Sequence, residues 1–271
     1  MNRKAIHHII IILSKELKKE LRRIIKNSSQ DNIHDFRIAV KKFRAFIRML
    51  NRHTSGTNNI NLSGKIKRIY KQTGKIRDLQ LQIARINDRK SNETDLSAYL
   101  FRLNKALNKR TRKLAKTFNT ISTKKIRLIK APDRFKRLPA EAIHSFIDKK
   151  SIVLRKLLSK CTVSDQTMHR IRKNMKDLLY LFTIREQFNL NTIAESYWND
   201  SKIQQADQLA GELGQYNDLC LATSFINAAY LNKLNPATVR QLRMIRQQWE
   251  IDKNNFKEKL HKELIKFLPA A

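Results

Sequence analysis

The segment "IHDFRIAVKKFRAFIRML" at 33–50 places basic side chains beside a full set of apolar ones. A helix turns by about 100° per residue, so the cations that follow His34 form one narrow stripe: Arg37, Lys41, Arg44 and Arg48. The apolar side chains occupy an adjoining arc. Aligned cations bind phosphate oxygens through charge-assisted hydrogen bonds. We therefore expect a helix that buries one face and presents anion-binding side chains on the other.

The second half of the chain repeats this pattern in "HRIRKNMK" at 169–176. His169 is followed three residues later by Arg172 and seven residues later by Lys176, the spacing found in the first segment. The second stripe is shorter, because no cation stands at the positions that extend the first one. We expect the second helix to contribute fewer contacts to a ligand.

A second pair of segments supports an internal duplication. "TGKIRDLQL" at 73–81 and "LGQYNDLCL" at 213–221 share the pattern Gly-x-x-x-Asp-Leu. The two pairs of matches occur in the same order and are offset by 135 and 140 residues. Such self-similarity is typical of repeated structural units. We predict two homologous bundles of about four helices each, at 1–131 and 132–271.

Further basic rows accompany these segments. The row with the fewest neighbouring acids has the same three-then-four spacing and comprises Arg102, Lys105, Lys109, Arg112 and Lys116. Another helix adds Lys71 and Lys75. Each long row extends about 20 Å at 1.5 Å per residue. A single row can be an ordinary solvated surface, but several rows that face one another would line a groove. We expect His34, Arg102 and Arg172 to share one concavity.

Two histidines and two aspartates occupy repeated positions within these segments. His34 and His169 open the two stripes, and a histidine donates best to phosphate when it is protonated, near or below pH 6.5. The alternative is that each histidine fills a structural hydrogen-bonding position. Asp78 and Asp218 stand among cations, and we expect them to orient those cations. The sequence has no Gly-rich phosphate loop, nucleophile elbow or zinc pattern, so it predicts no catalytic residue, cofactor or metal.

The high positive charge of the chain must either be offset by an anionic partner or reduce the stability of the fold. The 57 Lys and Arg outnumber the 23 Asp and Glu, which gives a formal net charge of +34. The first 131 residues hold 34 of the cations and 8 of the acids. Self-repulsion of this size destabilises a compact chain unless a polyanion offsets it. We expect a polyanion to bind, mainly to the first half.

The elements that must position these residues are helices. With only 5 Gly and 4 Pro in 271 residues, few positions favour tight turns. Apolar periodicity predicts an all-α protein with helices at 3–27, 32–52, 63–88, 94–121, 141–160, 166–189, 198–232 and 236–268. Asp31 could cap the second helix, and Asn235 followed by Pro236 is typical of a helix start. The segment "KAPDRFKRLPAEA" at 130–142 is the expected boundary between the halves.

Two features predict a cytoplasmic protein. Cys161 and Cys220 fit no metal-binding spacing, so we expect buried free thiols, which suit a reducing compartment. The apolar run at 9–13 is too short to span a membrane and is not followed by a small-residue cleavage site. We therefore predict no membrane contact and no targeting segment.

The paired segments "HDFRIAVKKFR" with "IRDLQL" and "HRIRKNMK" with "YNDLCL" resemble the conserved histidine α-helical domain family, CHAD. The resemblance spans almost the whole chain. It implies two pseudo-twofold-related four-helix bundles that form one compact unit with a basic central cavity. It also implies a stand-alone module that binds inorganic polyphosphate and is not an enzyme. Association with polyphosphate granules is left open.

The resemblance also implies which residues contact the ligand. It supports His34, Arg37, Lys41, Lys42, Arg44, Arg77, His169, Arg172 and Lys176, with Asp78 in an Arg-Asp pair. Taken with the basic rows, the predicted polyphosphate site comprises His34, Arg37, Lys41, Lys42, Arg44, Arg48, Lys71, Lys75, Arg77, Arg102, Lys105, Lys109, Arg112, Lys116, His169, Arg172, Lys173 and Lys176, supported by Asp78 and Asp218. The second repeat departs from the pattern at Asp177, Gln215 and Asn217, so it is expected to contribute less.

Two other functions remain open. DNA or RNA backbones would also bind the basic rows, although most phenylalanines lie on apolar arcs and Tyr180 is the main aromatic residue near a stripe. An enzyme acting on polyphosphate or nucleotides would need clustered carboxylates to hold its metal ions, and the acids of the first half are scattered. Polyphosphate is the favoured ligand. Its chain length and the oligomeric state of the protein are not predicted.

Overall fold

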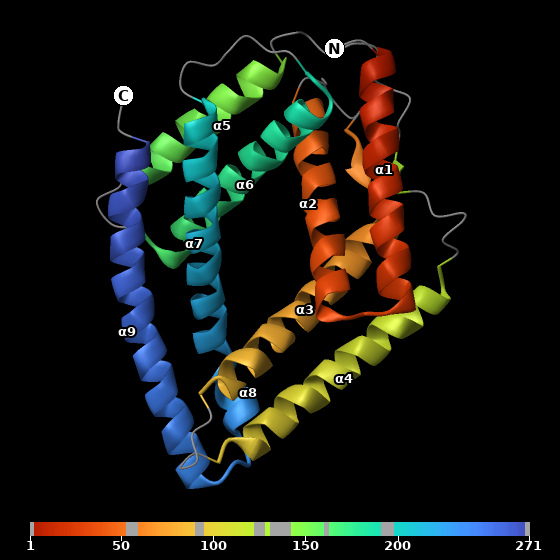
Figure 1. The fold of residues 1–271 in the computed structure, drawn as a ribbon. Coiled ribbons are helices and arrows are strands. Elements are labelled where there is room, and N and C mark those ends of the chain that lie inside the picture. The colour runs from red at the N-terminus through yellow and green to blue at the C-terminus, as the bar shows by residue number, and fades with distance from the viewer. Residues whose placement is uncertain are drawn as a thin grey trace.

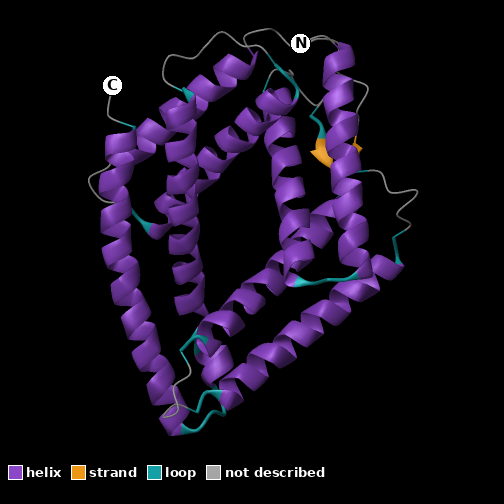
Figure 2. Ribbon diagram, in the orientation of Figure 1, coloured by secondary structure: helices purple, strands orange, loops and turns teal. Residues whose placement is uncertain are grey.

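The structure is a computed structural model that describes residues 3–52, 59–89, 95–121, 128–130, 142–159, 163–190 and 198–268. Within these ranges the regular secondary structure is helical apart from one very short strand pair, and loops join the helices (Figure 2). The helices are α1 (Arg3–Lys26), α2 (Gln30–Asn51), α3 (Gly64–Asn87), α4 (Ser97–Asn119), α5 (Ala142–Leu158), α6 (Asp165–Gln187), α7 (Asp200–Phe225), α8 (Ala228–Leu231) and α9 (Pro236–Phe267). The all-α prediction is confirmed.

The predicted helix at 198–232 is wrong at its C-terminal end. α7 ends at Phe225, and a separate turn of helix, α8, follows. Asn227 has extended backbone and its side-chain oxygen accepts a hydrogen bond from the Ala229 amide. This cap starts a new helix, as asparagine often does, and apolar periodicity alone did not reveal it.

Two strands were also not predicted. β1 (Asn61–Leu62) pairs antiparallel with β2 (Ile129–Lys130). Two residues are too few to show the alternation by which strands are recognised in a sequence. The pairing joins the segment before α3 to the segment after α4. The predicted boundary between the halves lies almost entirely at 131–141, outside the described residues.

Side-chain caps fix the start of the helices that carry the repeated segments. α2 is capped by Ser29, whose side chain accepts from the Asn32 amide. Asp31, the predicted cap, lies instead in the first turn, where its charge complements the helix dipole. The predicted start at Asn235 and Pro236 is confirmed, because Asn235 accepts from the Thr238 amide.

The helices pack in the same order in both halves (Figure 1). In the first half α1 packs on α2, α2 on α3 and α3 on α4. In the second half α5 packs on α6, α6 on α7 and α7 on α9. The halves meet chiefly where α2 contacts α6 and α3 contacts α7, with smaller contacts of α4 with α8 and of α2 with α5. The helices that carry the repeated motifs therefore form most of the contact between halves. The pseudo-twofold relation and the division at residue 131 stay predictions.

The apolar arcs of these helices form the core. Phe36 and Phe43 of α2 are fully buried, as are Leu17 of α1 and Ile171 of α6. Burial of each such side chain contributes about 2 kcal/mol to stability. One continuous core combines residues of both halves, so α2 and α6 are held firmly with their basic stripes away from it.

Two sequence expectations outside the core can also be compared with the structure. Cys220 is a free thiol, as predicted, but it is only partly buried, and Cys161 lies outside the described residues. No helix in the described ranges is both long enough and apolar enough to cross a membrane.

Candidate anion-binding cavity

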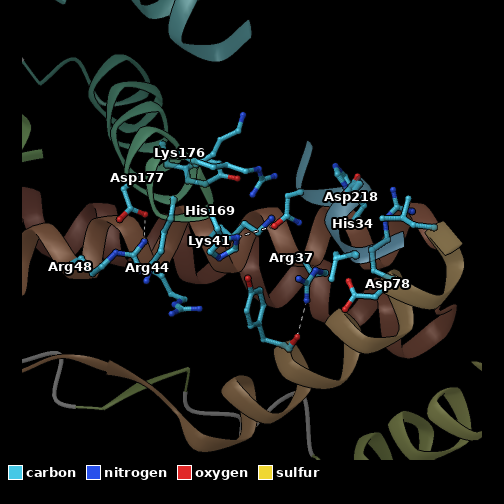
Figure 3. A pocket seen from close by; sticks show the side chains of 18 residues that line it. His34, Arg37, Lys41, Arg44, Arg48, Asp78, His169, Lys176, Asp177 and Asp218 are labelled. Atoms are coloured by element: carbon cyan, nitrogen blue, oxygen red, sulfur yellow. Dashed lines mark hydrogen bonds and ion pairs between the residues drawn. The ribbon is translucent and has the colours of Figure 1, made fainter. Parts of the chain in front are cut away.

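A cavity of about 520 Å³ lies where the two halves meet. It is bounded by α2, α3, α6 and α7. Its lining comprises His34, Arg37, Lys41, Arg44, Arg48, Tyr70, Arg77, Asp78, Leu81, His169, Arg172, Lys173, Lys176, Asp177, Tyr180, Asn217, Asp218 and Leu221 (Figure 3). We call this space the central cavity.

The basic stripes of α2 and α6 face each other across the central cavity. The stripe of α2 runs along its length, from Arg48 at one end to His34 at the other (Figure 3). α6 contributes Arg172, Lys173 and Lys176. His34 and Arg172 both line this cavity, so the expectation that they share one concavity is confirmed. Each stripe adjoins a buried apolar arc, and the burial of that arc fixes the direction of the stripe.

The central cavity is most positive in its middle. Eight Lys and Arg line it against three Asp. Asp177 lies near the Arg48 end, and Asp78 and Asp218 lie near the His34 end (Figure 3). The stretch between them carries Lys41 and Arg44, with Arg37 beside Asp78 at its edge. An anion is attracted most strongly to that stretch.

Arg37 is held in place by α3. Its Nη1 donates to the carbonyl oxygen of Tyr70 at 2.9 Å, and its guanidinium carbon lies 4.6 Å from the centroid of the Tyr70 ring. The guanidinium of Arg44 approaches the same ring, at 5.4 Å. Cation–π contacts of this kind orient the guanidinium without neutralising its charge. Arg37 and Arg44 therefore remain available to an anion.

The glycines of the repeated Gly-x-x-x-Asp-Leu segments make room for the arginines. A Cβ placed on Gly74 would lie 2.7 Å from Nη1 of Arg37, which is too close for any real contact. A Cβ on Gly214 would lie 3.4 Å from Nη2 of Arg172. The absence of a side chain at Gly74 thus lets the Arg37 guanidinium lie against α3, whereas a methyl group at Gly214 would make only an ordinary van der Waals contact with Arg172.

Replacing Gly74 with alanine should weaken anion binding without lowering the stability of the fold. The new methyl group would displace the Arg37 guanidinium, while alanine favours the helix by about 1 kcal/mol over glycine. We expect an unchanged or higher melting temperature and roughly tenfold weaker anion binding. Gly211→Ala is the matched control, because nothing lies within 4 Å of a Cβ there. Equal affinities of the two variants would contradict this role of Gly74.

Lys41 lies among cations of both stripes. Burial, together with the charges of Arg172, Arg37 and Lys176, lowers its pKa to about 8. The ammonium group is therefore held among like charges with too little compensation from Asp218. An anion beside Lys41 would relieve this repulsion and stabilise its charged form.

The two histidines have different neighbours. Burial lowers the pKa of His34 below its ordinary value, and the charges of Arg77 and Lys41 act in the same direction. At the equivalent place in the second half, Nδ1 of His169 lies 2.9 Å from Oδ1 of Asn217. An amide oxygen accepts only, so Nδ1 carries the proton in this contact. The replacement of arginine by Asn217 thus gives His169 a neutral partner where His34 has a cation.

The paired aspartates lie at the end of the central cavity where α3 meets α7. Burial raises the pKa of Asp78, and the charge of Asp218 adds to this, whereas Arg37 and Arg77 oppose it. Asp218 in turn stabilises the charged forms of Lys41 and Arg77. Both carboxylates therefore act electrostatically on the cations of the stripes, and their orienting role stays a prediction. In the described part of the chain, no group of three or more acidic, histidine or cysteine side chains is arranged to hold a metal ion.

Several predicted site residues line the central cavity less directly or not at all. Arg48 lines it but forms an ion pair with Asp177, which also accepts from Nζ of Lys150 at 3.0 Å. Lys42 is turned toward α1 and the end of α6, where its Nζ donates to Gln187 at 2.9 Å and lies 3.5 Å from Glu16. Asp177 is nearly fully buried. Its position in the second repeat therefore serves to neutralise Arg48 and Lys150.

The cations predicted on α3 were assigned to the wrong face. The residues of α3 that line the central cavity are Tyr70, Arg77, Asp78 and Leu81. Lys71 and Lys75 lie about 100° away from this face and are exposed to solvent. Arg77 is the one predicted cation of this helix that lines the cavity.

The expectation that the α4 row shares the cavity is wrong. Arg102, Lys105, Lys109, Arg112 and Lys116 line shallow hollows on the outside of α4. α4 packs on the side of α3 away from the central cavity (Figure 1). Nη1 of Arg102 donates to the carbonyl oxygen of Tyr230 at 3.3 Å, near α8.

The sequence also missed residues of the cavity. Tyr70 was not singled out, although it occurs one turn before Gly74 on the same face of α3, a spacing that could have revealed it. Tyr180 of α6, which the sequence did place near a stripe, also lines the cavity, and burial raises its pKa to about 12. Leu81 and Leu221, which occupy equivalent places in the two repeats, complete the wall.

Comparisons with known proteins agree with this fold. The CHAD domain family matches residues 12–227. The crystal structure of the CHAD domain from the plant Ricinus communis superimposes with a TM-score of 0.69 and 15% identity, over 99% of this chain and 92% of that one. PptA from Streptomyces chartreusis superimposes with a TM-score of 0.59 and 11% identity, over 97% of this chain and 98% of that one. A comparison with curated proteins gave no match.

The family match covers most of the chain, including both stripes, both glycines and both aspartates of the repeated segments. The solved structures extend the same all-α fold over nearly its whole length. The protein belongs to the CHAD domain family.

Proposed function

We propose that the central cavity binds inorganic polyphosphate, whose nonbridging oxygens accept hydrogen bonds from the stripes of α2 and α6. The observation that carries the proposal is the position of Lys41. Its pKa of about 8 results from burial and from the cations Arg172, Arg37 and Lys176 around it. A chain of phosphates would place negative charge among these side chains at once, which a single small anion could do only in part.

The unsatisfied donors of the cavity support the same proposal. Nη1 of Arg77, Nε of Arg172 and Nε of Arg48 are buried nitrogen atoms without a hydrogen-bond partner among the described residues. A buried donor that lacks a partner costs about 1–3 kcal/mol, and more when it is charged. Side chains that shift to meet phosphate oxygens would recover part of this cost.

The aromatic residues of the cavity favour phosphate over a nucleobase. The Tyr70 ring is already occupied by the guanidinium groups of Arg37 and Arg44. Tyr180 is partly buried. Binding to single strands usually relies on accessible aromatic faces on which bases stack. A ligand made only of phosphates needs no such face.

Titration and competition test the proposal. We expect long-chain polyphosphate to bind at about 0.15 M salt, with affinity that falls as salt rises. Duplex DNA and RNA, at equal phosphate concentration, should not displace polyphosphate from the cavity. Absence of polyphosphate binding at this salt, or complete displacement by nucleic acid, would contradict the proposal.

We further propose that the protein binds polyphosphate without hydrolysing it, in the cytoplasm and at polyphosphate granules where these occur. Two of the three carboxylates in the lining lie beside Arg37 and Arg77, and the third pairs with Arg48. They are therefore engaged with cations. Orthophosphate release on incubation with polyphosphate and Mg²⁺ would contradict a pure binding role. Fluorescence microscopy of the tagged protein tests the location.

A further inference from the structure

The outer face of α4 is a second basic surface, distinct from the central cavity. α4 carries seven cations and no acid over residues 97–119. Six of them are exposed: Lys105, Lys109, Arg110, Arg112, Lys113 and Lys116. Within the described ranges none of the six forms an ion pair with a carboxylate. Solvated helices usually mix charges and gain pairs at i, i+4, so this concentration of unpaired cations marks the face as an anion-binding surface.

An exposed aromatic side chain lies within this basic face. Phe101 is 69% exposed, the highest value among the large apolar residues that the structure exposes. Measured around the helix, Phe101 falls within about 60° of Lys105, Arg112 and Lys116. A phenylalanine at this position contributes nothing to the core and leaves apolar surface in water. Its ring is thus free to contact a ligand that the cations attract.

The face is hollowed on both sides of Phe101. One hollow of about 970 Å³ extends along α4 and is lined by Phe101, Lys105, Lys109 and Arg112, among others. A second hollow of about 820 Å³ shares Phe101, Lys105 and Lys109, and is completed by Tyr230 and Lys233 at and after α8. Two aromatic rings, one on each helix, therefore border a continuous groove with cations along its length. We call it the α4 groove.

We propose that the α4 groove binds single-stranded nucleic acid. Its cations would meet the backbone phosphates, and Phe101, with Tyr230, would stack on unpaired bases. Such a pairing of a basic groove with aromatic platforms is the usual means of binding single strands without sequence preference. The opposite holds in the central cavity, where arginines occupy the Tyr70 ring and Tyr180 is partly buried. The two sites thus differ in the chemistry they offer, although both are basic.

Other anions fit the α4 groove less well. Polyphosphate has no apolar part and would gain nothing from Phe101. A membrane surface binds helices that present a broad apolar face, and Phe101 is the only large apolar residue of α4 that is strongly exposed. A duplex keeps its bases stacked inside and offers no face to the ring. Single strands alone use both the cations and the aromatic side chain.

Fluorescence anisotropy with a labelled single-stranded oligonucleotide of about 12 nucleotides tests the proposal. Phe101→Ala should weaken binding by roughly fivefold or more. Removing three cations, in Lys105→Gln/Lys109→Gln/Arg112→Gln, should lower the magnitude of the salt slope by about 2. A matched cavity variant, Arg37→Gln/Arg172→Gln, should leave oligonucleotide binding within about twofold. An abasic strand of the same length should bind more weakly than the intact strand, because it offers phosphates without bases.

Three outcomes would overturn the assignment. Equal binding of the intact and abasic strands would show that the groove binds the phosphates alone and makes no contact with the bases. Unchanged affinity of Phe101→Ala would remove the stacking role. Stronger binding to vesicles of anionic lipid than to the oligonucleotide would indicate a membrane surface instead. Circular dichroism of each variant checks that the fold is retained, and polyphosphate binding is measured in parallel, so that failure at the groove is not confused with failure at the central cavity.

Discussion

Replacing Arg37, Lys41 and Arg44 together with alanine should weaken polyphosphate binding at least about a hundredfold. Each charge-assisted hydrogen bond contributes about 1.5–3 kcal/mol, and all three side chains line the cavity along α2. The dependence of affinity on salt should flatten at the same time, because fewer counterions are exchanged on binding. Calorimetric titration at several salt concentrations measures both effects.

The α4 groove offers a control with the same change in net charge. Lys105, Lys109 and Arg112, replaced together with alanine, remove three cations that line the outside of α4. Polyphosphate affinity of this variant should stay within about threefold of the wild type. If both triple variants lose affinity equally, the ligand responds to overall charge and the cavity is not its site. Loss of helicity in the first variant is not expected, since none of its three residues belongs to the buried core.

The affinity for polyphosphate should fall as the pH rises above about 8. The pKa of Lys41 is about 8 before ligand binds, because burial and neighbouring cations disfavour its charge. Phosphate oxygens beside it favour the charged form and raise that pKa in the complex. Binding above pH 8 therefore takes up a proton, and affinity falls by up to about tenfold per pH unit until the pKa of the complex is reached. Titrations between about pH 7 and pH 9.5 measure the decline.

Lys41→Arg isolates this effect, because arginine stays charged throughout this range. The decline above pH 8 should largely disappear in that variant and persist in Lys105→Arg, whose position lies outside the cavity. A decline of the same size in Lys41→Arg would show that another group is responsible. His34 should add a separate gain in affinity on the acid side, since its pKa lies below its ordinary value.

Helical periodicity was sufficient to predict how α2 and α6 present their stripes. Each stripe adjoins an apolar arc, and because that arc is buried in the core, the cations beside it must point away from the core. The repeat further predicted that the two stripes face each other, because equivalent helices in two halves meet at equivalent faces. His34 and Arg172 could therefore be placed in one cavity without coordinates. The repeat matched Gly74 with Gly214, but it did not reveal that Gly74 makes room for the Arg37 guanidinium.

The α4 row shows where this reasoning fails. Periodicity distinguishes a buried face from an exposed one, but an exposed face can border a cavity or the outside of the molecule. Arg102 and Lys105 have the same spacing as Arg37 and Lys41, yet α3 separates them from the central cavity. Only the packing order of the helices decides between these positions, and no local pattern encodes it.

Long-range pairs were equally inaccessible from the sequence. Asp177 departs from the repeat, and the sequence could only indicate that the second half binds less strongly. In the structure Asp177 neutralises Arg48, 129 positions earlier, and Lys150 of α5. Likewise Asn217 replaces an arginine and contacts His169. Such contacts arise from the meeting of helices that are distant in the chain, so the departures could be seen but their consequences could not.

A crystal structure with polyphosphate bound tests the central claim most directly. Phosphate density should run along the central cavity, with oxygens within hydrogen-bond distance of Lys41, Arg37 and Arg172. Density confined to the outside of α4, with these three side chains in contact only with protein and water, would contradict the assignment of the cavity as the polyphosphate site.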